Sequence, residues 1–336
     1  MSWFGKSRES QNSVVQSVIK PPSFPTLGRR LTKTKKTIPS CLPTHVPGFD
    51  SLIFSSGGSG GLPLGKPGMT LLAGGPGTGK SLLTYMITAQ QLNYGNKVQF
   101  HTFEKAPEVV AFEISRIIKQ LQLNVKVEAH SDLMSIEGLE IVDSYYHDYG
   151  KQTVALTVRD ISDWHNQTNG KLVVIDSLTE MVLWEGELRV AIKNFLSGLT
   201  SNLKDRPEEI AILGTSQHRG ARQDPGLAGG IALGHRSNAV IQVDSTFISQ
   251  FDKGYFGLPR GTQVRRIWVE KTADFAHSPE EHYLQISPEG ICTIGDPIPE
   301  ISGRCRKCGE SINYSEDKII KIPKEGSYHL ECYGKE

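Results

Sequence analysis

The sequence predicts an α/β protein with a doubly wound core, in which a mostly parallel sheet has helices on both faces and an antiparallel edge. Two observations support this prediction. Apolar runs typical of buried strands alternate with amphipathic helical patterns through residues 66–245. Strand patterns at 239–244, 264–271 and 281–286 then follow one another without a helix between them, which favours antiparallel pairing.

Size and composition are those of a soluble globular protein. The 336 residues suffice for one large α/β domain with small appendages, and 38% apolar and 22% charged residues are ordinary values. No apolar run approaches the roughly 18 residues that a membrane-spanning helix needs. Five cysteines, an odd number, disfavour a disulfide framework and favour a reducing compartment. We therefore expect a cytoplasmic protein without a membrane span.

The N-terminal arm, residues 1–40, is strongly basic. It holds eight lysine or arginine residues against one acid, Glu9, which gives a net charge of +7. The arm is rich in Ser, Pro and Gln and has no apolar period, so we predict that most of it is disordered. Three roles are compatible with this composition: contact with nucleic-acid phosphates, an organelle transit segment, or a solvated tail.

A phosphate-binding loop is the clearest motif of the chain. Residues 74–81 read Gly-Gly-Pro-Gly-Thr-Gly-Lys-Ser and fit the pattern G-x-x-x-x-G-K-[ST] at every position. An apolar run at 69–73 predicts a buried strand before the loop, and a helical pattern with one apolar face follows it and ends before Gly95. Strand, glycine loop and helix together predict a nucleoside triphosphate site.

Each residue type in this loop has a chemical role. Glycines let successive backbone N–H groups turn toward a phosphate, and the helix N-terminus adds a partial positive charge. Lys80 is predicted to contact the β- and γ-phosphates, and the Ser81 hydroxyl is predicted to hold Mg²⁺. The predicted nucleotide-binding residues of this segment are Gly75, Pro76, Gly77, Thr78, Gly79, Lys80, Ser81 and Leu82.

Two further strands end in acidic residues that suit nucleotide hydrolysis. Residues 171–177 contain an unbroken apolar run that ends at Asp176, as expected for a strand buried on both faces of a parallel sheet. Asp176 is predicted to lie beside the phosphate loop and to hold Mg²⁺ with its water shell. The run 98–103 ends at Glu104, which we expect on a strand next to the phosphate-loop strand, where it would activate the attacking water.

Two long helices are predicted between strands. One starts at Pro107, because a proline suits the first helical position, and the other spans residues 188–203. Residues 123–160 show no clear period, and 154–160 fit either a helix or a strand. The apolar stripe predicted for the first helix comprises Val110, Phe112, Ile114, Ile117, Ile118 and Leu121.

The segment before the phosphate loop shows a family resemblance. Residues 43–52 read Pro-Thr-His-Val-Pro-Gly-Phe-Asp-Ser-Leu, and residues 61–65 read Gly-Leu-Pro-Leu-Gly. With the loop behind them, they resemble the start of a KaiC-type domain of the RecA superfamily, and the resemblance covers residues 42–294. It implies a RecA-like fold for residues 41–300, ATP hydrolysis, and assembly into a hexameric ring or a filament. A clock role is not implied, because the Ser-Thr pair that clock proteins phosphorylate has no match.

The resemblance also bears on two strand ends near the nucleotide. Gln217, which closes the strand 209–217 after Thr215 and Ser216, occupies the place where the superfamily senses the γ-phosphate. Residues 103–107 resemble the family pattern F-E-E-[ST]-P, but Lys105 replaces the second glutamate. The resemblance to the superfamily implies that Glu104 alone suffices for hydrolysis, and the missing second glutamate disfavours self-phosphorylation.

A third strand resembles the segment that the family directs at a neighbouring subunit's nucleotide. Residues 269–277 resemble a strand that ends in K-x-R-G-x-x-H; Lys271 and His277 match, but Ala273 replaces the arginine. The resemblance therefore implies that Lys271 acts in trans as a point charge. Reserve candidates for this charge are Arg260, Arg265 and Arg266.

The C-terminal segment, residues 301–336, has the ligand spacing of a structural zinc site. Its pattern is C-x₂-C-x₂₀-H-x₂-C, and four soft or borderline ligands in two pairs suit tetrahedral Zn²⁺. The segment resembles the first zinc module of LIM domains and also the zinc finger of poly(ADP-ribose) polymerases, which bind proteins and DNA ends respectively. Cys41 and Cys292 fall outside the pattern and are predicted to be buried. The predicted zinc ligands are Cys305, Cys308, His329 and Cys332.

Two functions remain open for an oligomeric ATPase that uses ATP, Mg²⁺ and Zn²⁺. The basic arm and the glycine-rich, basic stretch 218–236 favour action on DNA in recombination, repair or replication. The KaiC-like segment before the phosphate loop and the near-neutral core favour a nucleotide-driven signalling or assembly switch that recruits a protein through the zinc finger.

Overall fold

The computed structural model describes the central part of the chain and one C-terminal hairpin. The described residues are 39–65, 67–130, 133–144, 153–183, 188–205, 209–219, 226–227, 237–248, 259–298, 319–322 and 326–329. Nearly all of the predicted basic arm and three of the four predicted zinc ligands, Cys305, Cys308 and Cys332, lie outside these residues.

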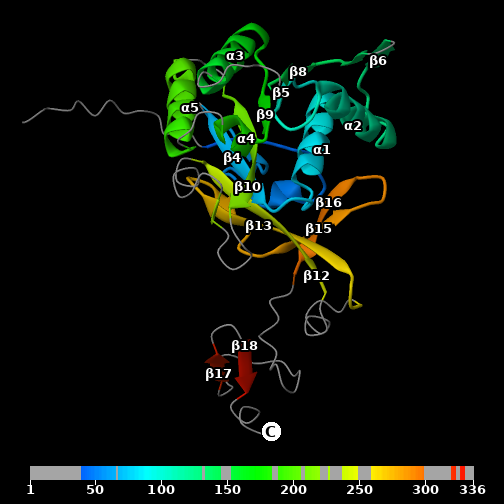
Figure 1. Cartoon of the computed structure of the whole chain (residues 1–336), viewed down its shortest axis with the longest axis vertical. Coiled ribbons are helices and arrows are strands. Elements are labelled where there is room, and N and C mark those ends of the chain that lie inside the picture. Colours follow the sequence, from blue (N-terminus) through cyan, green and yellow to red (C-terminus); the bar gives the residue numbers. More distant parts are fainter. Residues whose placement is uncertain are drawn as a thin grey trace, which may run out of the picture. The chain divides into compact units, whose positions relative to one another are not determined.

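A ten-stranded sheet forms the centre of the fold (Figure 1). Its strands are β4 (Gly68–Gly74), β5 (Val98–Thr102), β8 (Leu139–Asp143), β9 (Leu172–Asp176), β10 (Ala211–Arg219), β11 (Gly226–Leu227), β12 (Ala239–Phe247), β13 (Gln263–Thr272), β15 (His282–Ile286) and β16 (Cys292–Pro297). They run in the order β16-β15-β13-β12-β4-β10-β9-β5-β8, and β11 pairs with β10.

The strand directions confirm the predicted sheet. From β12 through β4, β10, β9 and β5 to β8, neighbouring strands are parallel. From β12 through β13 and β15 to β16, neighbouring strands are antiparallel. The carboxyl ends of the parallel strands therefore meet at one edge of the sheet, where α/β proteins bind their ligands.

Helices cover both faces of the sheet, as the doubly wound prediction requires. In Figure 1 the pair α1–α2 and the pair α3–α5 lie on opposite sides of the strands. The helices are α1 (Lys80–Asn93), α2 (Pro107–Gln120), α3 (Thr153–Thr168), α4 (Leu178–Leu183) and α5 (Leu188–Leu203).

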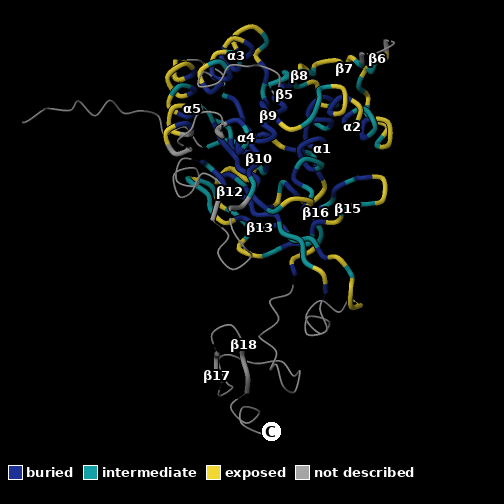
Figure 2. The backbone as a smooth tube through the Cα atoms, viewed as in Figure 1, coloured by how far each residue is buried: buried dark blue, intermediate teal, exposed yellow. Residues whose placement is uncertain are grey.

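Alternation along the strands divides the core into two apolar clusters. In β9, Leu172 and Val174 belong to the cluster that contains residues of α1 and α2, whereas Val173 and Ile175 belong to the cluster with residues of α3 and α5. The period of two explains this division, because successive side chains point to opposite faces of a strand. Figure 2 shows the resulting buried sheet between more exposed helices.

Short elements complete the described chain. They are β1 (Cys41–Leu42), the 3₁₀ turn η1 (Phe49–Ser51), β2 (Ile53–Phe54), β3 (Leu62–Pro63), β6 (Val127–His130), β7 (Leu133–Ile136) and β14 (Ala276–His277). A separate antiparallel hairpin consists of β17 (Ile319–Ile322) and β18 (Gly326–His329). No helix within the described ranges is long and apolar enough to cross a membrane.

Three expectations need correction or completion. Phe112 is 56% exposed although it was assigned to the buried stripe of its helix; Val110 and Ile114, which flank it, are fully buried. The ambiguous stretch 154–160 lies within helix α3. The strand that leads to Glu104 is not next to the phosphate-loop strand, because β9 and β10 lie between β5 and β4. Cys41 and Cys292 are buried free thiols, as predicted.

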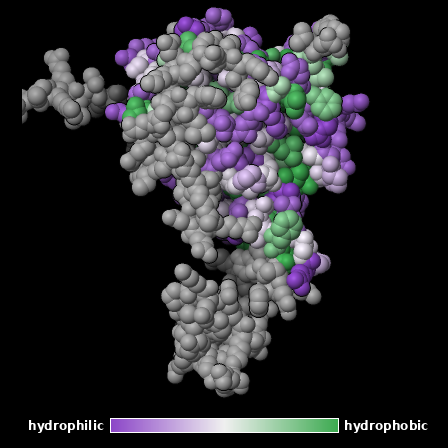
Figure 3. Space-filling model, viewed as in Figure 1, coloured by the Kyte–Doolittle hydropathy of each residue, from purple (hydrophilic) through white to green (hydrophobic). Residues whose placement is uncertain are grey.

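The described surface mixes polar and apolar residues. In the view of Figure 3, hydrophilic and hydrophobic patches alternate over the described residues rather than forming one broad apolar face. The large hydrophobic side chains that are exposed within the described ranges are Tyr94, Val109, Phe112, Val190 and Phe247.

Candidate active site

The phosphate loop connects β4 to α1 in the predicted strand–loop–helix arrangement. Gly77 and Gly79 have φ values of 72° and 106°, which only glycine adopts readily, so these positions need their residue type. Thr78, within the loop, is buried, and its hydroxyl donates to the Gly75 carbonyl at 2.9 Å. The Lys80 ammonium donates to the carbonyls of Gly74 and Gly75 at 2.9 and 2.8 Å. The sequence thus folds the loop around the lysine that is predicted to contact phosphate.

Asp176 ends β9 and faces residues of two other elements. Its carboxylate accepts hydrogen bonds from the hydroxyl of Thr215 on β10, at 2.6 Å, and from the hydroxyl of Ser81 on α1. Burial raises the pKa of Asp176, and these two hydrogen bonds oppose that rise. A strand, β10, separates β9 from β4, but the shared edge of the sheet still brings Asp176 to the loop serine.

Glu104 follows β5 and is held by two polar side chains. Its Oε1 atom accepts a hydrogen bond from the Ser177 hydroxyl at 2.7 Å and another from the Gln217 side-chain amide at 3.3 Å. Ser177 is buried, whereas Glu104 is exposed. The main chain of Gln217 is fixed in turn, because its N–H donates to the Thr179 hydroxyl at 3.0 Å. The carboxylate of Glu104 is therefore accessible but oriented.

These groups line one cavity of about 410 Å³. Most of the predicted nucleotide-site residues therefore surround a common space, which the strand order alone would not show. The lining residues are Pro76, Gly77, Gly79, Lys80, Ser81, Leu82, Glu104, Lys105, Asp176, Ser177, Thr215, Gln217, Arg265 and Ile286.

The charges in this cavity influence one another. Burial lowers the pKa of Lys80, while the carboxylates of Asp176 and Glu104 act in the opposite direction. Outside the lining, Glu180 on the first turn of α4 has a raised pKa because it is partly buried and because Glu104 carries the same charge. The cavity thus combines two desolvated charges of opposite sign with an exposed carboxylate, an arrangement that favours binding of a charged ligand.

Lys271, the predicted donor in trans, does not line this cavity. It lies on β13, and its ammonium donates to the Ser237 carbonyl at 3.3 Å. Of the three reserve arginines, only Arg265 lines the cavity. Arg266 forms ion pairs with Asp244 and Glu281, both at 2.8 Å.

Sequence reasoning missed several residues of this cavity. Lys105 and Arg265 were considered only for other roles, and Ile286 was assigned only to a strand. Thr215 was placed correctly at a strand end, but its bond to Asp176 depends on β10 lying beside β9. Polar residues at the carboxyl ends of parallel strands are the signal that would have found Thr215 and Ser177.

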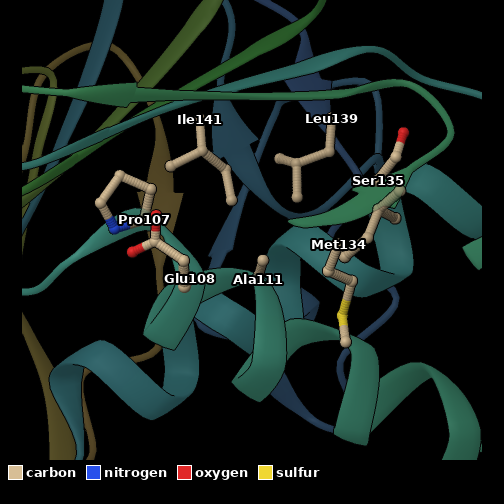
Figure 4. A pocket seen from close by; sticks show the side chains of 8 residues that line it. Pro107, Glu108, Ala111, Met134, Ser135, Leu139 and Ile141 are labelled. Carbon is tan, nitrogen blue, oxygen red and sulfur yellow. The ribbon is translucent and has the colours of Figure 1, made fainter. Parts of the chain in front are cut away.

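A second cavity, of about 340 Å³, lies between α2 and the strands β7 and β8. Figure 4 shows Leu139 and Ile141 extending from the strand toward α2, with Ala111 and Met134 on the other side. Among the described residues that line it, Glu108 alone is ionisable. The described lining is mostly apolar and does not offer the cations that phosphate chemistry needs.

The family follows from a match over most of the chain. A family model described as the KaiC ATPase matches residues 42–297. The chain belongs to the KaiC ATPase family. The match includes the phosphate loop, Glu104, Asp176, Gln217 and Lys271 and ends before the C-terminal cysteine and histidine pairs.

This KaiC-family chain is similar to two archaeal proteins of the UPF0273 group. It is 24% identical to one from Aeropyrum pernix, over 78% of this chain and 96% of that protein. It is 26% identical to one from Pyrobaculum aerophilum, over 84% of this chain and 88% of that protein. Its fold is similar to that of a KaiC-like protein from Pyrococcus horikoshii, with a TM-score of 0.55 and 20% identity, over 77% of this chain and all of that one. The RecA-like fold is thereby supported.

Proposed function

We propose that this KaiC-family protein binds ATP with Mg²⁺ and hydrolyses it. The observation that supports the proposal best is the convergence of Ser81, Asp176 and Glu104 on the cavity of the phosphate loop. The hydroxyl and the carboxylate at 81 and 176 are oxygen ligands of the kind that Mg²⁺ prefers. Glu104 is the exposed carboxylate that is free of this pair and can accept a proton.

The chain's own residues account for the remaining requirements. Backbone N–H groups of residues 75–81 would hold the phosphates, and Lys80 would exchange its two carbonyl partners for phosphate oxygens. Ser177 and Gln217 orient Glu104 toward the attacking water. Mg²⁺, when bound, would neutralise charge on the phosphates.

Paired binding and turnover measurements test this function. Lys80→Ala should lose nucleotide binding, measured with a fluorescent ATP analogue, whereas Glu104→Gln should bind ATP normally and lose at least about 100-fold in kcat. The exposed lysine of α2 provides a control, Lys119→Met, which should change neither quantity. A Glu104→Gln protein that keeps wild-type turnover would contradict the assigned base.

Assembly and a DNA target are the finer parts of the proposal. We expect a hexamer or filament in which Lys271 adds charge at the neighbouring subunit's nucleotide. Two basic segments support contact with DNA: residues 1–40, with a net charge of +7, and residues 218–222, at the start of the stretch 218–236. ATPase rates with and without single-stranded and duplex DNA, across a salt series, test this target. Lack of stimulation and of salt-dependent binding would favour the alternative, a switch that recruits a protein.

A structural zinc site is proposed for the C-terminal segment. The hairpin β17–β18 ends at His329, one of the four predicted ligands, and the other three flank it in sequence. No group of three metal-ligating side chains occurs among the described residues, a range that omits the three cysteines. Metal analysis should find about one zinc ion per chain. Cys305→Ser should lower that content without changing ATP turnover, whereas loss of turnover would mean that the segment packs into the ATPase domain.

A further inference from the structure

Lys105 has a main chain that is fixed at the edge of the nucleotide cavity. It follows Glu104 in the turn between β5 and α2. The Thr102 hydroxyl donates to the Lys105 carbonyl at 2.6 Å and accepts from the Lys105 N–H at 3.3 Å. Because Thr102 is buried, this pair of bonds fastens the turn to the sheet. The starting point of the lysine side chain is thus as well defined as the strand itself.

The ammonium of Lys105 is held by a neutral group. Its Nζ donates to the Tyr85 hydroxyl at 3.1 Å and lies 5.2 Å from the centre of the same ring. Tyr85 is buried on α1, one turn after Ser81, and burial together with nearby carboxylates raises its pKa, so the hydroxyl keeps its proton. A phenol takes up only one of the three N–H donors of a lysine and leaves its charge uncancelled.

No carboxylate of the described residues forms an ion pair with Lys105. Glu104, its neighbour, is bonded to Ser177 and Gln217 instead. The charge of Lys105 nevertheless acts on Asp176, whose pKa it helps to lower against the larger effect of burial. Lys105 therefore lies at the end of the cavity that holds the two acidic groups, with a charge available to a ligand.

The cavity needs such a charge for phosphoryl transfer. Negative charge on the transferred group must be neutralised, and preorganised cations do this in a site that excludes water. Lys80 comes from the loop beneath the phosphates, and Arg265 comes from β13 on the antiparallel side of the sheet. Among the described lining residues, Lys105 is the cation that lies next to Glu104, the proposed base.

We propose that Lys105 is a catalytic residue that binds the γ-phosphoryl group of ATP within its own subunit. The inference rests on the proposed ATP hydrolysis. In that reaction, water oxygen bonds to the γ-phosphorus, the bond from that phosphorus to the β–γ bridging oxygen breaks, and Glu104 accepts a proton from the water. Lys105 transfers no proton; its ammonium stabilises the charge on the γ-phosphoryl oxygens. Each subunit would thus supply a cation to its own nucleotide. The arginine that the family pattern directs at a neighbouring subunit's nucleotide is replaced here by Ala273.

Kinetics and a transition-state analogue test this role in the full-length protein. Lys105→Met should lower kcat about 100-fold, the effect typical of losing one charge-stabilising donor, and Lys105→Arg should restore part of the rate. Lys105→Met should also weaken binding of ADP with aluminium fluoride at least tenfold while it changes ADP affinity less than threefold. Tyr85→Phe, which removes only the hydroxyl, should lower kcat by a smaller factor. Lys119→Met on α2 is the matched control.

Subunit mixing shows whether Lys105 acts in its own pocket. Lys105→Met and Glu104→Gln subunits, co-expressed or mixed after dissociation, should not restore activity, because every pocket then lacks one group. Restored activity would overturn the assignment within one subunit. Wild-type kcat in Lys105→Met would overturn the catalytic role, although Glu104→Gln would still report on hydrolysis itself. A wild-type protein that binds ATP without turnover would overturn hydrolysis and this role together.

Discussion

The parallel half of the sheet and its antiparallel edge differ in whether their charged groups form ion pairs. At the carboxyl ends of β5, β9 and β10, Asp176 is buried and has a raised pKa, and no basic side chain among the described residues forms an ion pair with it. On the antiparallel edge, Arg266 pairs with Asp244 and Glu281 at 2.8 Å and remains partly exposed. The parallel half thus buries a carboxyl group without an ion pair, whereas the charges on the antiparallel edge are paired.

This difference suggests that the buried carboxyl group serves ligand binding and that the paired charges serve stability. A buried carboxylate costs free energy until a cation or ligand compensates it. Ion pairs at a partly exposed edge contribute modestly to the folded state and hold no ligand. We therefore expect substitutions at the carboxyl ends of the parallel strands to change turnover strongly, sometimes with a gain in stability. Substitutions in the ion-pair network of Arg266 should change stability more than turnover.

The largest effect is expected for Asp176→Asn, which should lower turnover at least about 100-fold because a Mg²⁺ ligand is lost. The raised pKa means that the folded state holds the proton more tightly than the unfolded chain, so stability is lost as pH rises through the folded pKa. At neutral pH the neutral amide should therefore raise the melting temperature of the nucleotide-free protein by about 2–4 °C. A lowered melting temperature would contradict this account of the buried charge.

Gly79→Ala should produce the next largest effect, because it lies where the two regions meet. A Cβ at this position would stand 2.7 Å from Cδ1 of Ile286 on β15, and the φ of 106° is unfavourable for alanine. We expect a stability loss of about 1–2 kcal/mol and at least tenfold weaker ATP binding. Ile286→Ala in the same protein should recover the smaller part that comes from the contact. Full recovery would show that backbone strain contributes nothing.

Two adjacent arginines on β13 allow a matched comparison. Arg265 lines the nucleotide cavity, whereas Arg266 belongs to the ion-pair network. Arg265→Met should weaken ATP binding about tenfold with little change in stability. Arg266→Met should cost about 1 kcal/mol of stability and leave kcat and ATP affinity unchanged. The reverse pattern, measured by denaturant unfolding and nucleotide titration, would mean that Arg266 rather than Arg265 contacts the nucleotide.

The effect expected to be smallest at neutral pH concerns the buried His101 of β5, because its contribution to stability develops only in acid. Its ring contacts Gln99 at 3.1 Å and Ser144 at 3.4 Å, and burial lowers its pKa to about 3. The unfolded chain binds a proton below its ordinary pKa of 6.5 and the folded chain does not, so stability falls as pH drops from 6.5 toward 3. Each pH unit costs up to about 1.4 kcal/mol. His101→Gln should have a shallower slope between pH 6 and 4.5, whereas an unchanged slope would assign the acid sensitivity to other groups.

Local patterns predicted most of the ATPase fold. The strand–loop–helix around residues 74–81, the helix 188–203 and the antiparallel edge follow from apolar periods and glycine placement. Glu104, Asp176 and Gln217 were also predicted, because polar residues that end buried strands are visible in a single sequence. The structure brings all three into one cavity.

Such local patterns could not predict which strands are neighbours in the sheet. Nothing in the run 98–103 tells which strands lie beside it, so the predicted contact between β5 and β4 was wrong although Glu104 still reaches the cavity. The sequence indicates only that Lys105 replaces a glutamate of the family pattern, because its bond to Tyr85 joins residues 20 positions apart on two different elements. Phe112 fits the helical period, but periodicity cannot show that nothing packs against that face.

The two bonds to Glu104 make its carboxylate oxygens unequal. Oε1 accepts from both Ser177 and Gln217, while no hydrogen bond to Oε2 occurs within the described residues. Oε1 is thus held by two hydrogen bonds, and Oε2 is left to contact a substrate. Glu104→Asp, which shortens the side chain by one methylene, would keep the charge. The shorter carboxylate could reach either Ser177 and Gln217 or the substrate, but not both. The length of the side chain, as much as its acidity, therefore restricts this position to glutamate.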